Sequence, residues 1–267
     1  MFYTISSFLL IMFCMHPSHG MQNNVTESTQ MTQKNQSYLA QNTQGNTIIL
    51  KGEVIVGKTE ILDKKIKSLS PLFIPSYLRQ EIEFAQNCSK ITTSEDLANE
   101  YFFKSLAPLF AQGKKNVDWK LFEQKTKEEL ETFFATLNWS QYSSEQDINV
   151  FITALDQKTG KELGVIQAIT TPKFEQNHIR IGLFGVSSSI NDLKIKQLLV
   201  SSIFKMFPNA QRLFLHTRST DTATIELYQS WGFTEFKGTL LHWTDLEYVT
   251  NKSDTLQKTA ANFVIQN

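Results

Sequence analysis

The stretch "TRSTDTATIELYQSWGFTEF", residues 217–236, carries the clearest pattern of the chain. Asp221 follows a polar turn and begins a helix that the apolar spacing predicts over 221–231. Tyr228 lies on a face of this helix from which its ring can lean toward the preceding strand. Gly232 supplies the left-handed backbone that ends such a helix. The stretch therefore predicts a strand, a helix and a second strand in succession, with the tyrosine turned toward the first strand.

The segments before this stretch add further strands and helices. Two apolar runs around a glycine-closed turn at 156–160 predict a hairpin, and the apolar run 178–186 predicts a central strand. From residue 80 the predicted strands are 80–87, the two of the hairpin in 149–170, 178–186, 211–217 and a pair in 233–249, and the predicted helices are 94–110, 118–137, 190–207 and 221–231.

The order of these elements is β-α-α-β-β-β-α-β-α-β-β. A chain of this kind packs as a mixed sheet with helices on both faces. The sequence therefore predicts an α/β fold with a central mixed sheet of about six to seven strands.

The rest of the chain is interpreted as flanking segments. Residues 1–20 combine an apolar run with small residues at the positions that a signal peptidase reads, so we expect a signal peptide and export, or a cytoplasmic protein if the signal is not cleaved. Residues 21–46 are polar and predict a disordered linker. Residues 47–79 contain two prolines and predict an irregular lead-in with a strand or hairpin, the domain is placed at 80–249, and 250–267 are expected to be a polar tail.

Charge and motif content exclude several functions. The 267 residues include 26 Lys and Arg and 26 Asp and Glu, so no net field gathers nucleic acid or an anionic membrane. Cys88 is the only cysteine outside the signal, which leaves no intramolecular disulfide and no cysteine-based metal site. We expect Cys88 to be a small buried apolar residue. No metal site is predicted, because no His-Glu-x-x-His motif is present.

The element order and the opening stretch resemble the GNAT superfamily of acyl-CoA N-acyltransferases. The resemblance implies a GNAT-like sheet, acetyl-CoA as co-substrate, and transfer of an acetyl group to a primary amine of a small molecule, a peptide N-terminus or a lysine. It extends over about residues 80–249, and its specific part is the spacing of Thr217, Asp221, Thr224, Ile225, Leu227, Tyr228, Gly232 and Phe233.

The resemblance also implies catalytic roles. It assigns to Tyr228 the role of protonating or hydrogen-bonding the thiolate that leaves. The alternative is a tyrosine that only packs its ring and bonds a backbone carbonyl. A base is needed to take a proton from the amine, and His178, at the start of a strand, and His216, next to Thr217, are the candidates, with Glu162 further off and water as another alternative.

The family places a glycine-rich loop at the pyrophosphate of the cofactor, after the central strand. An ungapped alignment sets residues 191–196 at those positions, and lysines at 194 and 196 replace both glycines. Asp192 adds a negative charge there or caps the helix, and the lysine ammoniums can partly replace the backbone donors. The cofactor-binding residues implied by the resemblance are Phe184, Val186, Asn191, Leu193, Lys194, Ile195, Lys196, Asp221 and Thr224.

Three hypotheses remain open from the sequence. The first is an active N-acetyltransferase. The second is an exported pseudoenzyme or binding protein of GNAT fold with lost or weakened binding of CoA. The third is an exported protein that enters another cell and meets acetyl-CoA there.

Overall fold

A computed structural model describes residues 36–89, 91–94, 104–171, 177–187, 193–236 and 243–265. The strands are β1 (Ser37–Gln41), β2 (Thr47–Val56), β3 (Ile148–Asp156), β4 (Glu162–Thr170), β5 (His178–Val186), β6 (Arg212–Arg218), β7 (Thr234–Phe236), β8 (Trp243–Val249) and β9 (Val264–Ile265). The α-helices are α2 (Glu60–Asn87), α4 (Trp119–Thr136), α5 (Leu193–Met206), α6 (Thr222–Ser230) and α7 (Thr255–Ala261). Short 3₁₀ helices are η1 (Lys104–Phe110), η2 (Lys114–Asn116) and η3 (Trp139–Tyr142).

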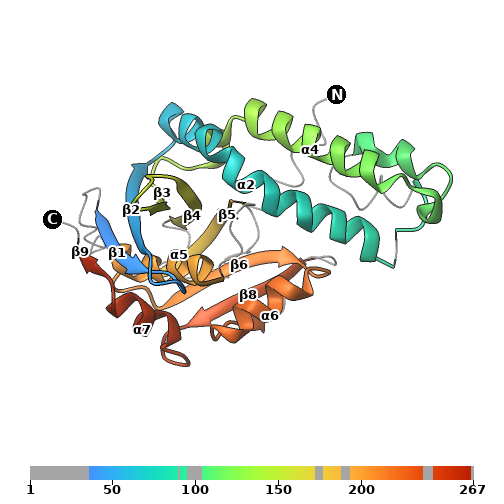
Figure 1. Cartoon of the computed structure of the whole chain (residues 1–267). Helices are drawn as coiled ribbons and strands as arrows, with labels where there is room; N and C mark the ends of the chain where they lie inside the picture. Colours follow the sequence, from blue (N-terminus) through green and yellow to red (C-terminus); the bar gives the residue numbers. More distant parts are fainter. Residues whose placement is uncertain are drawn as a thin grey trace, which may run out of the picture.

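The described strands form one sheet in the order β7-β8-β6-β5-β4-β3-β2-β1-β9 (Figure 1). All neighbours are antiparallel except β5 and β6, which run parallel. The predicted mixed α/β class is confirmed, with nine strands where about six to seven were expected. From α4 to β8 the predicted order of elements is confirmed, whereas the predicted strand 80–87 is helical and the described end of the predicted helix 94–110 is the 3₁₀ helix η1.

Helices cover both faces of the sheet, as expected. One apolar core lies between the sheet and α5, α6 and α7, and the other lies between the sheet and α2 and α4 (Figure 1). Cys88 is buried in the second core, which confirms it as a small apolar residue. A side chain at Gly185 of β5 would collide with the backbone of Leu72 and Phe73, so glycine is what lets α2 lie directly on β5.

Helix α2 corrects the prediction for residues 60–87. An irregular segment and a strand over 80–87 were expected, whereas the structure has one helix that includes Pro71 and Pro75. Proline lacks the N–H that would bond the carbonyl four residues earlier. For Pro71 that carbonyl belongs to Lys67, and the Ser70 hydroxyl donates to it at 2.8 Å instead. The helix therefore continues because a neighbouring side chain satisfies the group that the proline leaves open.

The two flanking segments also contribute to the sheet. Ser37–Gln41, within the expected disordered linker, forms β1, whose Tyr38 and Ala40 are buried. The expected polar tail contains α7 and β9, and β9 pairs with β1. Leu256, Ala260 and Phe263 are spaced four and three residues apart, which gives this polar segment one apolar face. Residues 1–20 lie outside the described residues, so the signal peptide stays a prediction.

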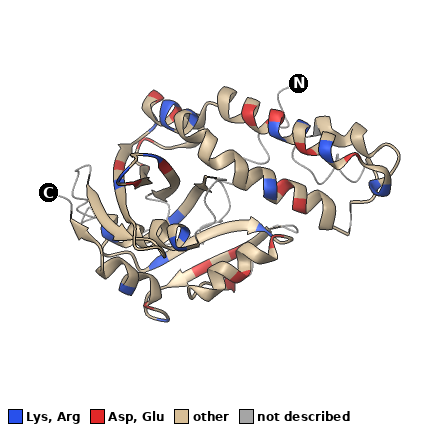
Figure 2. Ribbon diagram, in the orientation of Figure 1, with Lys and Arg blue, Asp and Glu red and all other residues tan. Residues whose placement is uncertain are grey.

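Charges of both signs follow one another along α2 and α4 (Figure 2), in keeping with the even charge balance of the sequence. Among the described helices, none is both long and apolar enough to cross a membrane.

Strands β5 and β6 pair over only a short length. Their ladder runs from His178 opposite Arg212 to Arg180 opposite Phe214. On its other edge β5 has an extra residue relative to β4, between the partners of Ile166 and Ala168. Such a bulge bends a strand and changes its twist. Beyond Arg180 the two strands therefore diverge, and we call the space between residues 181–186 and 215–218 the fork.

Candidate active site

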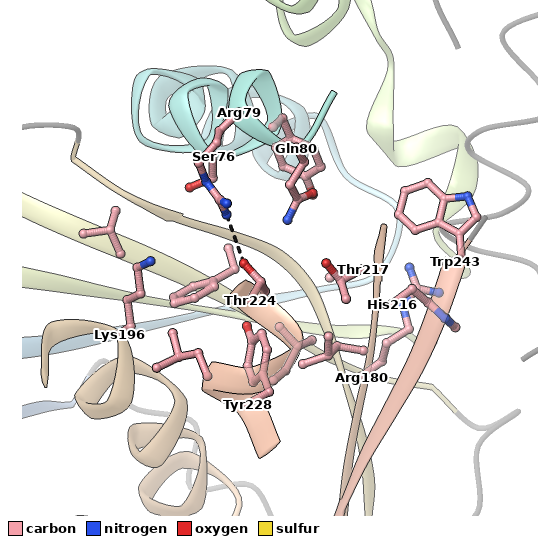
Figure 3. Close-up of a pocket in the computed structure, with 17 residues that line it drawn as sticks. Ser76, Arg79, Gln80, Arg180, Lys196, His216, Thr217, Thr224, Tyr228 and Trp243 are labelled. Carbon is pink, nitrogen blue, oxygen red and sulfur yellow. Dashed lines mark hydrogen bonds between the residues drawn. The ribbon is translucent and has the colours of Figure 1, made fainter. Parts of the chain in front are cut away.

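A cavity lies at the fork (Figure 3). Its lining includes the cations of Arg79, Arg180 and Lys196, and no Asp or Glu is among the described residues that line it. The lining residues are Ser76, Tyr77, Arg79 and Gln80 of α2, Arg180, Ile181, Gly182, Phe184 and Val186 of β5, Lys196 of α5, Leu215, His216 and Thr217 of β6, Thr224, Leu227 and Tyr228 of α6, and Trp243 of β8.

The lining residues come from both faces of the sheet. Side chains alternate between faces along a strand. On β6, Arg218 faces α2, because its guanidinium bonds Glu81 of that helix at 2.9 Å, and His216 shares this face. Leu215 packs in the opposite core together with Tyr228, and Thr217 shares that face. The fork thus has an α2 side, which includes His216, and an α6 side, which includes Tyr228.

Tyr228 is buried, and its ring lies edge-on to Trp231 and Phe233 at centroid distances of 5.4 and 5.1 Å. Its hydroxyl makes no hydrogen bond within the part of the chain that the structure describes, and it lines the cavity. Burial raises the pKa of Tyr228, and the carboxylate of Asp221 raises it further. The phenol therefore stays protonated well above neutral pH and can act as a donor.

His216 stands opposite Asp245 on β8 in the antiparallel ladder. Nδ1 of the imidazole contacts Oδ1 of Asp245, whose side chain is almost fully buried. Because Nδ1 is engaged by the carboxylate, Nε2 is the nitrogen that remains for chemistry on the α2 side of the cavity. The structure thus supplies an oriented imidazole beside the fork.

Asp221 is fully buried and bound on several sides. It caps α6, accepting from the Thr224 amide at 3.1 Å. Both of its oxygens also accept from Arg79 of α2 at 3.1 Å. Arg79 donates as well to the Thr224 hydroxyl at 2.9 Å (Figure 3). Asp221 and Thr224, which the resemblance assigned to the cofactor, are therefore already joined to α2.

Only some of the other residues assigned to the cofactor line the cavity. Phe184, Val186 and Lys196 line the cavity. Burial lowers the pKa of Lys196, and Arg79 lowers it further, so two cations lie close together at this end. Outside the lining, Leu193 is exposed, Lys194 bonds Gln197 at 2.9 Å, Ile195 is packed in the core and Asn191 lies outside the described residues.

The candidate bases are also separated. His216 lines the cavity, whereas His178 and Glu162 are not among its lining residues. His178 pairs with Arg212 at the closed end of the β5–β6 ladder, and Glu162 begins β4. The geometry favours His216 for this role.

Sequence reasoning missed the contribution of α2 to the site. Arg79 falls in the segment that was predicted to be an irregular lead-in, and Gln80 falls at the start of the predicted strand 80–87. Glu81 forms a buried ion pair with Arg218, whose guanidinium lies between the rings of Phe84 and Trp243 at 4.2 and 4.4 Å. The signal available in the sequence was the charge pattern Arg79, Glu81 and Glu83 within an apolar stretch.

Thr217 was singled out only as the end of a strand. Its hydroxyl is buried, lines the cavity and has no hydrogen-bond partner among the described residues. A buried polar atom without a partner is costly, so a partner from a ligand is the natural completion.

No family model matches the sequence, and no curated protein matches it. Solved structures of acetyltransferases are similar over part of the chain. The NatC complex bound to Gag peptide and CoA is 25% identical over 37% of this chain and 70% of that one, with a TM-score of 0.33. Arabidopsis thaliana NAA60 with a bisubstrate analogue is 19% identical over 39% and 77%, with a TM-score of 0.34. Campylobacter jejuni N-acetyltransferase PseH with acetyl coenzyme A is 13% identical over 49% and 85%, with a TM-score of 0.32. At these TM-scores, the function has to be argued from the residues of this chain itself.

Proposed function

We propose that this protein is a GNAT-type N-acetyltransferase, which moves an acetyl group from acetyl-CoA to a primary amine. One observation carries the proposal. The free hydroxyl of Tyr228 and the imidazole of His216, held by Asp245, line one cavity from its two sides.

The fork suits an acyl-CoA as substrate. The edge of β5 beyond Arg180 has no ladder partner on its β6 side within the described chain. An extended arm that carries amides can pair with such an edge as an added strand. Lys196 lines the cavity, where its ammonium can bind phosphate in place of the backbone donors of a glycine loop. The hydroxyl of Thr217 offers one more polar contact in the same cavity.

The residues then divide the chemistry between them. Nε2 of His216 takes the proton that the amine loses as its nitrogen bonds the thioester carbonyl carbon. Asp245 is a positioning residue, because it holds Nδ1 and so fixes the ring and its tautomer. When the C–S bond breaks, the Tyr228 hydroxyl donates its proton or a hydrogen bond to the leaving sulfur. The acceptor is an amine-bearing small molecule, a peptide N-terminus or a lysine.

The test is a titration of the full chain with acetyl-CoA, followed by an assay of free thiol released in the presence of a mixture of primary amines. We expect binding and a thiol release that depends on the amine. No binding at millimolar acetyl-CoA would refute the proposal. The variant Lys196→Gln should weaken binding by about tenfold, since a charge-assisted bond to phosphate is lost, whereas Lys158→Gln, in the exposed β3–β4 turn, should bind as the parent chain does.

A second candidate function is that of a binding protein that keeps the fold without turnover. The observation in its favour is the bond network of Arg79 with Asp221 and Thr224, which occupies two of the residues assigned to the cofactor. Binding of acetyl-CoA without release of thiol would favour this candidate. Export of the protein remains a prediction from residues 1–20.

A further inference from the structure

We infer that Tyr77 of α2 is a further catalytic residue, whose hydroxyl donates a hydrogen bond to the carbonyl oxygen of the acetyl group while that oxygen carries negative charge. The inference rests on the proposed function and deepens it. That function assigns His216 to the amine nitrogen and Tyr228 to the sulfur, which leaves the carbonyl oxygen as the reacting atom that still needs a donor.

Tyr77 lies over the fork because of its position along α2. One turn before it, the backbone of Phe73 lies so near to Gly185 of β5 that a Cβ there would come within 2.8 Å of the Phe73 Cα. One turn after it, Glu81 binds Arg218 of β6 at 2.9 Å. Residues four apart lie on one face of a helix. Tyr77 is therefore midway along the face of α2 that spans β5 and β6, where these strands diverge.

The hydroxyl of Tyr77 is available to a ligand. The ring packs against the second core, with its centroid 5.9 Å from that of Phe134, and the residue also lines the cavity. Within the described ranges the hydroxyl makes no hydrogen bond. Burial raises the pKa of Tyr77, and the opposing effect of Arg180 is smaller, so the phenol stays protonated at neutral pH. Tyr77 thus presents a neutral O–H donor to the cavity.

Tyr77 and Tyr228 reach the cavity from opposite sides of the sheet. Tyr77 belongs to α2 and Tyr228 to α6, and they are close enough that ionisation of Tyr77 raises the pKa of Tyr228. An acetyl group held between them can direct its oxygen to one phenol and its sulfur to the other. Its methyl group then meets the apolar side chains of Leu215 and Leu227, which line the same cavity.

The proposed step leaves Tyr77 protonated throughout. As the amine nitrogen bonds the carbonyl carbon, the π pair of the C=O bond moves to oxygen and the amine proton goes to Nε2 of His216. The Tyr77 hydroxyl stabilises this oxyanion without transferring its proton, and it needs no reorganisation because it is already in place. The C=O bond then re-forms, the C–S bond breaks with its electron pair on sulfur, and Tyr228 donates to that sulfur. Exchange with solvent restores the protons of His216 and Tyr228.

The first arm of the experiment measures kcat for amine-dependent thiol release from acetyl-CoA by the full chain. Tyr77→Phe keeps the ring and loses only the hydroxyl, so kcat should fall by about 10²–10³-fold, while the calorimetric Kd changes by less than about threefold. Tyr142→Phe removes the hydroxyl of another tyrosine that packs against the same core outside the cavity lining, and it should keep the kcat of the parent chain.

Urea denaturation of Tyr77→Phe separates a loss of activity from a loss of fold. The Tyr77 hydroxyl has no partner in the described chain, so its removal leaves no group of the protein unpaired. We therefore expect the variant to be at least as stable as the parent chain.

The second arm requires binding but no turnover. Infrared difference spectra of acetyl-CoA isotopically labelled at the carbonyl carbon report the C=O stretch of the bound thioester. A hydrogen bond from Tyr77 weakens this bond, so the stretch should move to higher frequency in Tyr77→Phe. In Tyr228→Phe the stretch should stay where it is in the parent chain, because Tyr228 serves the sulfur.

The two arms distinguish failure of the inference from failure of the proposed function. A lower kcat together with a higher C=O frequency in Tyr77→Phe supports the inference. Binding and turnover by the parent chain, with either readout unchanged in Tyr77→Phe, would overturn the inference alone. A frequency shift without turnover by the parent chain would support the hydrogen bond from Tyr77 and refute the transferase. Absence of acetyl-CoA binding would overturn both.

Discussion

Arg79 of α2 bonds both carboxylate oxygens of Asp221 at 3.1 Å across 142 positions of sequence, and Asp221 in turn caps the helix that carries Tyr228. The pair fixes the start of α6 against α2 next to the fork. The tyrosine thereby receives its place from a helix that the sequence pattern did not predict.

Removal of Arg79 is expected to destabilise the fold. In Arg79→Gln the buried carboxylate of Asp221 loses its cation. Because Arg79 is partly exposed and solvent screens its charge, we expect the free energy of unfolding to fall by only about 1–3 kcal/mol. Urea denaturation measures it. The double variant Arg79→Gln with Asp221→Asn should recover part of the loss, since the buried charge is then gone. Equal stability of Arg79→Gln and the parent chain would show that the pair contributes nothing.

The buried pair of Glu81 and Arg218 is expected to contribute more to the free energy of unfolding than the pair of Arg79 and Asp221. Both side chains are almost fully buried, so Glu81→Gln leaves an uncompensated guanidinium and should cost about 3–5 kcal/mol. Replacing both residues by methionine should be far less harmful than either single change. The control is Lys64→Gln, which removes an exposed pair with Glu60 and should change stability by less than about 1 kcal/mol. The prediction would be refuted if Glu81→Gln lowered the free energy of unfolding by no more than Lys64→Gln does.

Asp245→Asn tests whether the carboxylate positions His216. The histidine stays in place but loses the partner that fixes its tautomer, so kcat should fall by about 10²-fold or more, while the Kd for acetyl-CoA changes little. Asp245→Glu should rescue part of the activity. A loss confined to stability, with kcat intact in the folded fraction, would make Asp245 a purely structural residue.

Alkaline pH offers a test of burial at the fork. The pKa of Tyr228 is raised by burial first and by Asp221 next, and the pKa of Tyr77 is raised by burial. A group whose pKa is raised in the folded protein makes its full contribution to stability at pH values below its pKa in the unfolded chain, which is near 10 for tyrosine. This contribution is lost as the pH rises above that pKa. The free energy of unfolding should therefore decrease above about pH 10 by up to about 1.4 kcal/mol per pH unit for each tyrosine.

Tyr228→Phe should reduce this slope above about pH 10 by the contribution of one group. Denaturation at several pH values between about 9 and 11 measures the difference. Identical slopes in the variant and the parent chain would mean that Tyr228 ionises as readily in the folded protein as in the unfolded one.

The order of elements and the C-terminal half of the fold could be predicted from local patterns. The hairpin of β3 and β4, strand β5, and helix α6 with its exit at Gly232 follow from apolar periodicity and turn chemistry. Helix α2 could not be predicted, because two prolines, Pro71 and Pro75, lie inside it and proline usually ends a helix. Strand β1 and helix α7 were missed because each has only a few apolar residues. These residues are enough to hold each element in place because they pack against the existing core.

Part of the candidate site was within reach of the sequence and part was not. Tyr228 stands in a helix of predictable register, and His216 follows from its place at the end of a strand. Asp245 is brought to His216 by the antiparallel register of β6 and β8, and Arg79 is brought to Asp221 by tertiary packing. Contacts between distant segments of this kind leave no local pattern in a single sequence.

The central claim is that Tyr228 serves the leaving thiolate in a fork that binds acetyl-CoA. The most direct measurement compares Tyr228→Phe with the parent chain, by calorimetric Kd for acetyl-CoA and by kcat for amine-dependent thiol release. The kcat of Tyr228→Phe should be lower by about 10²-fold or more, as for the loss of a general acid, with Kd changed by less than about threefold. An unchanged kcat would contradict the proposed role and return Tyr228 to that of a core aromatic residue.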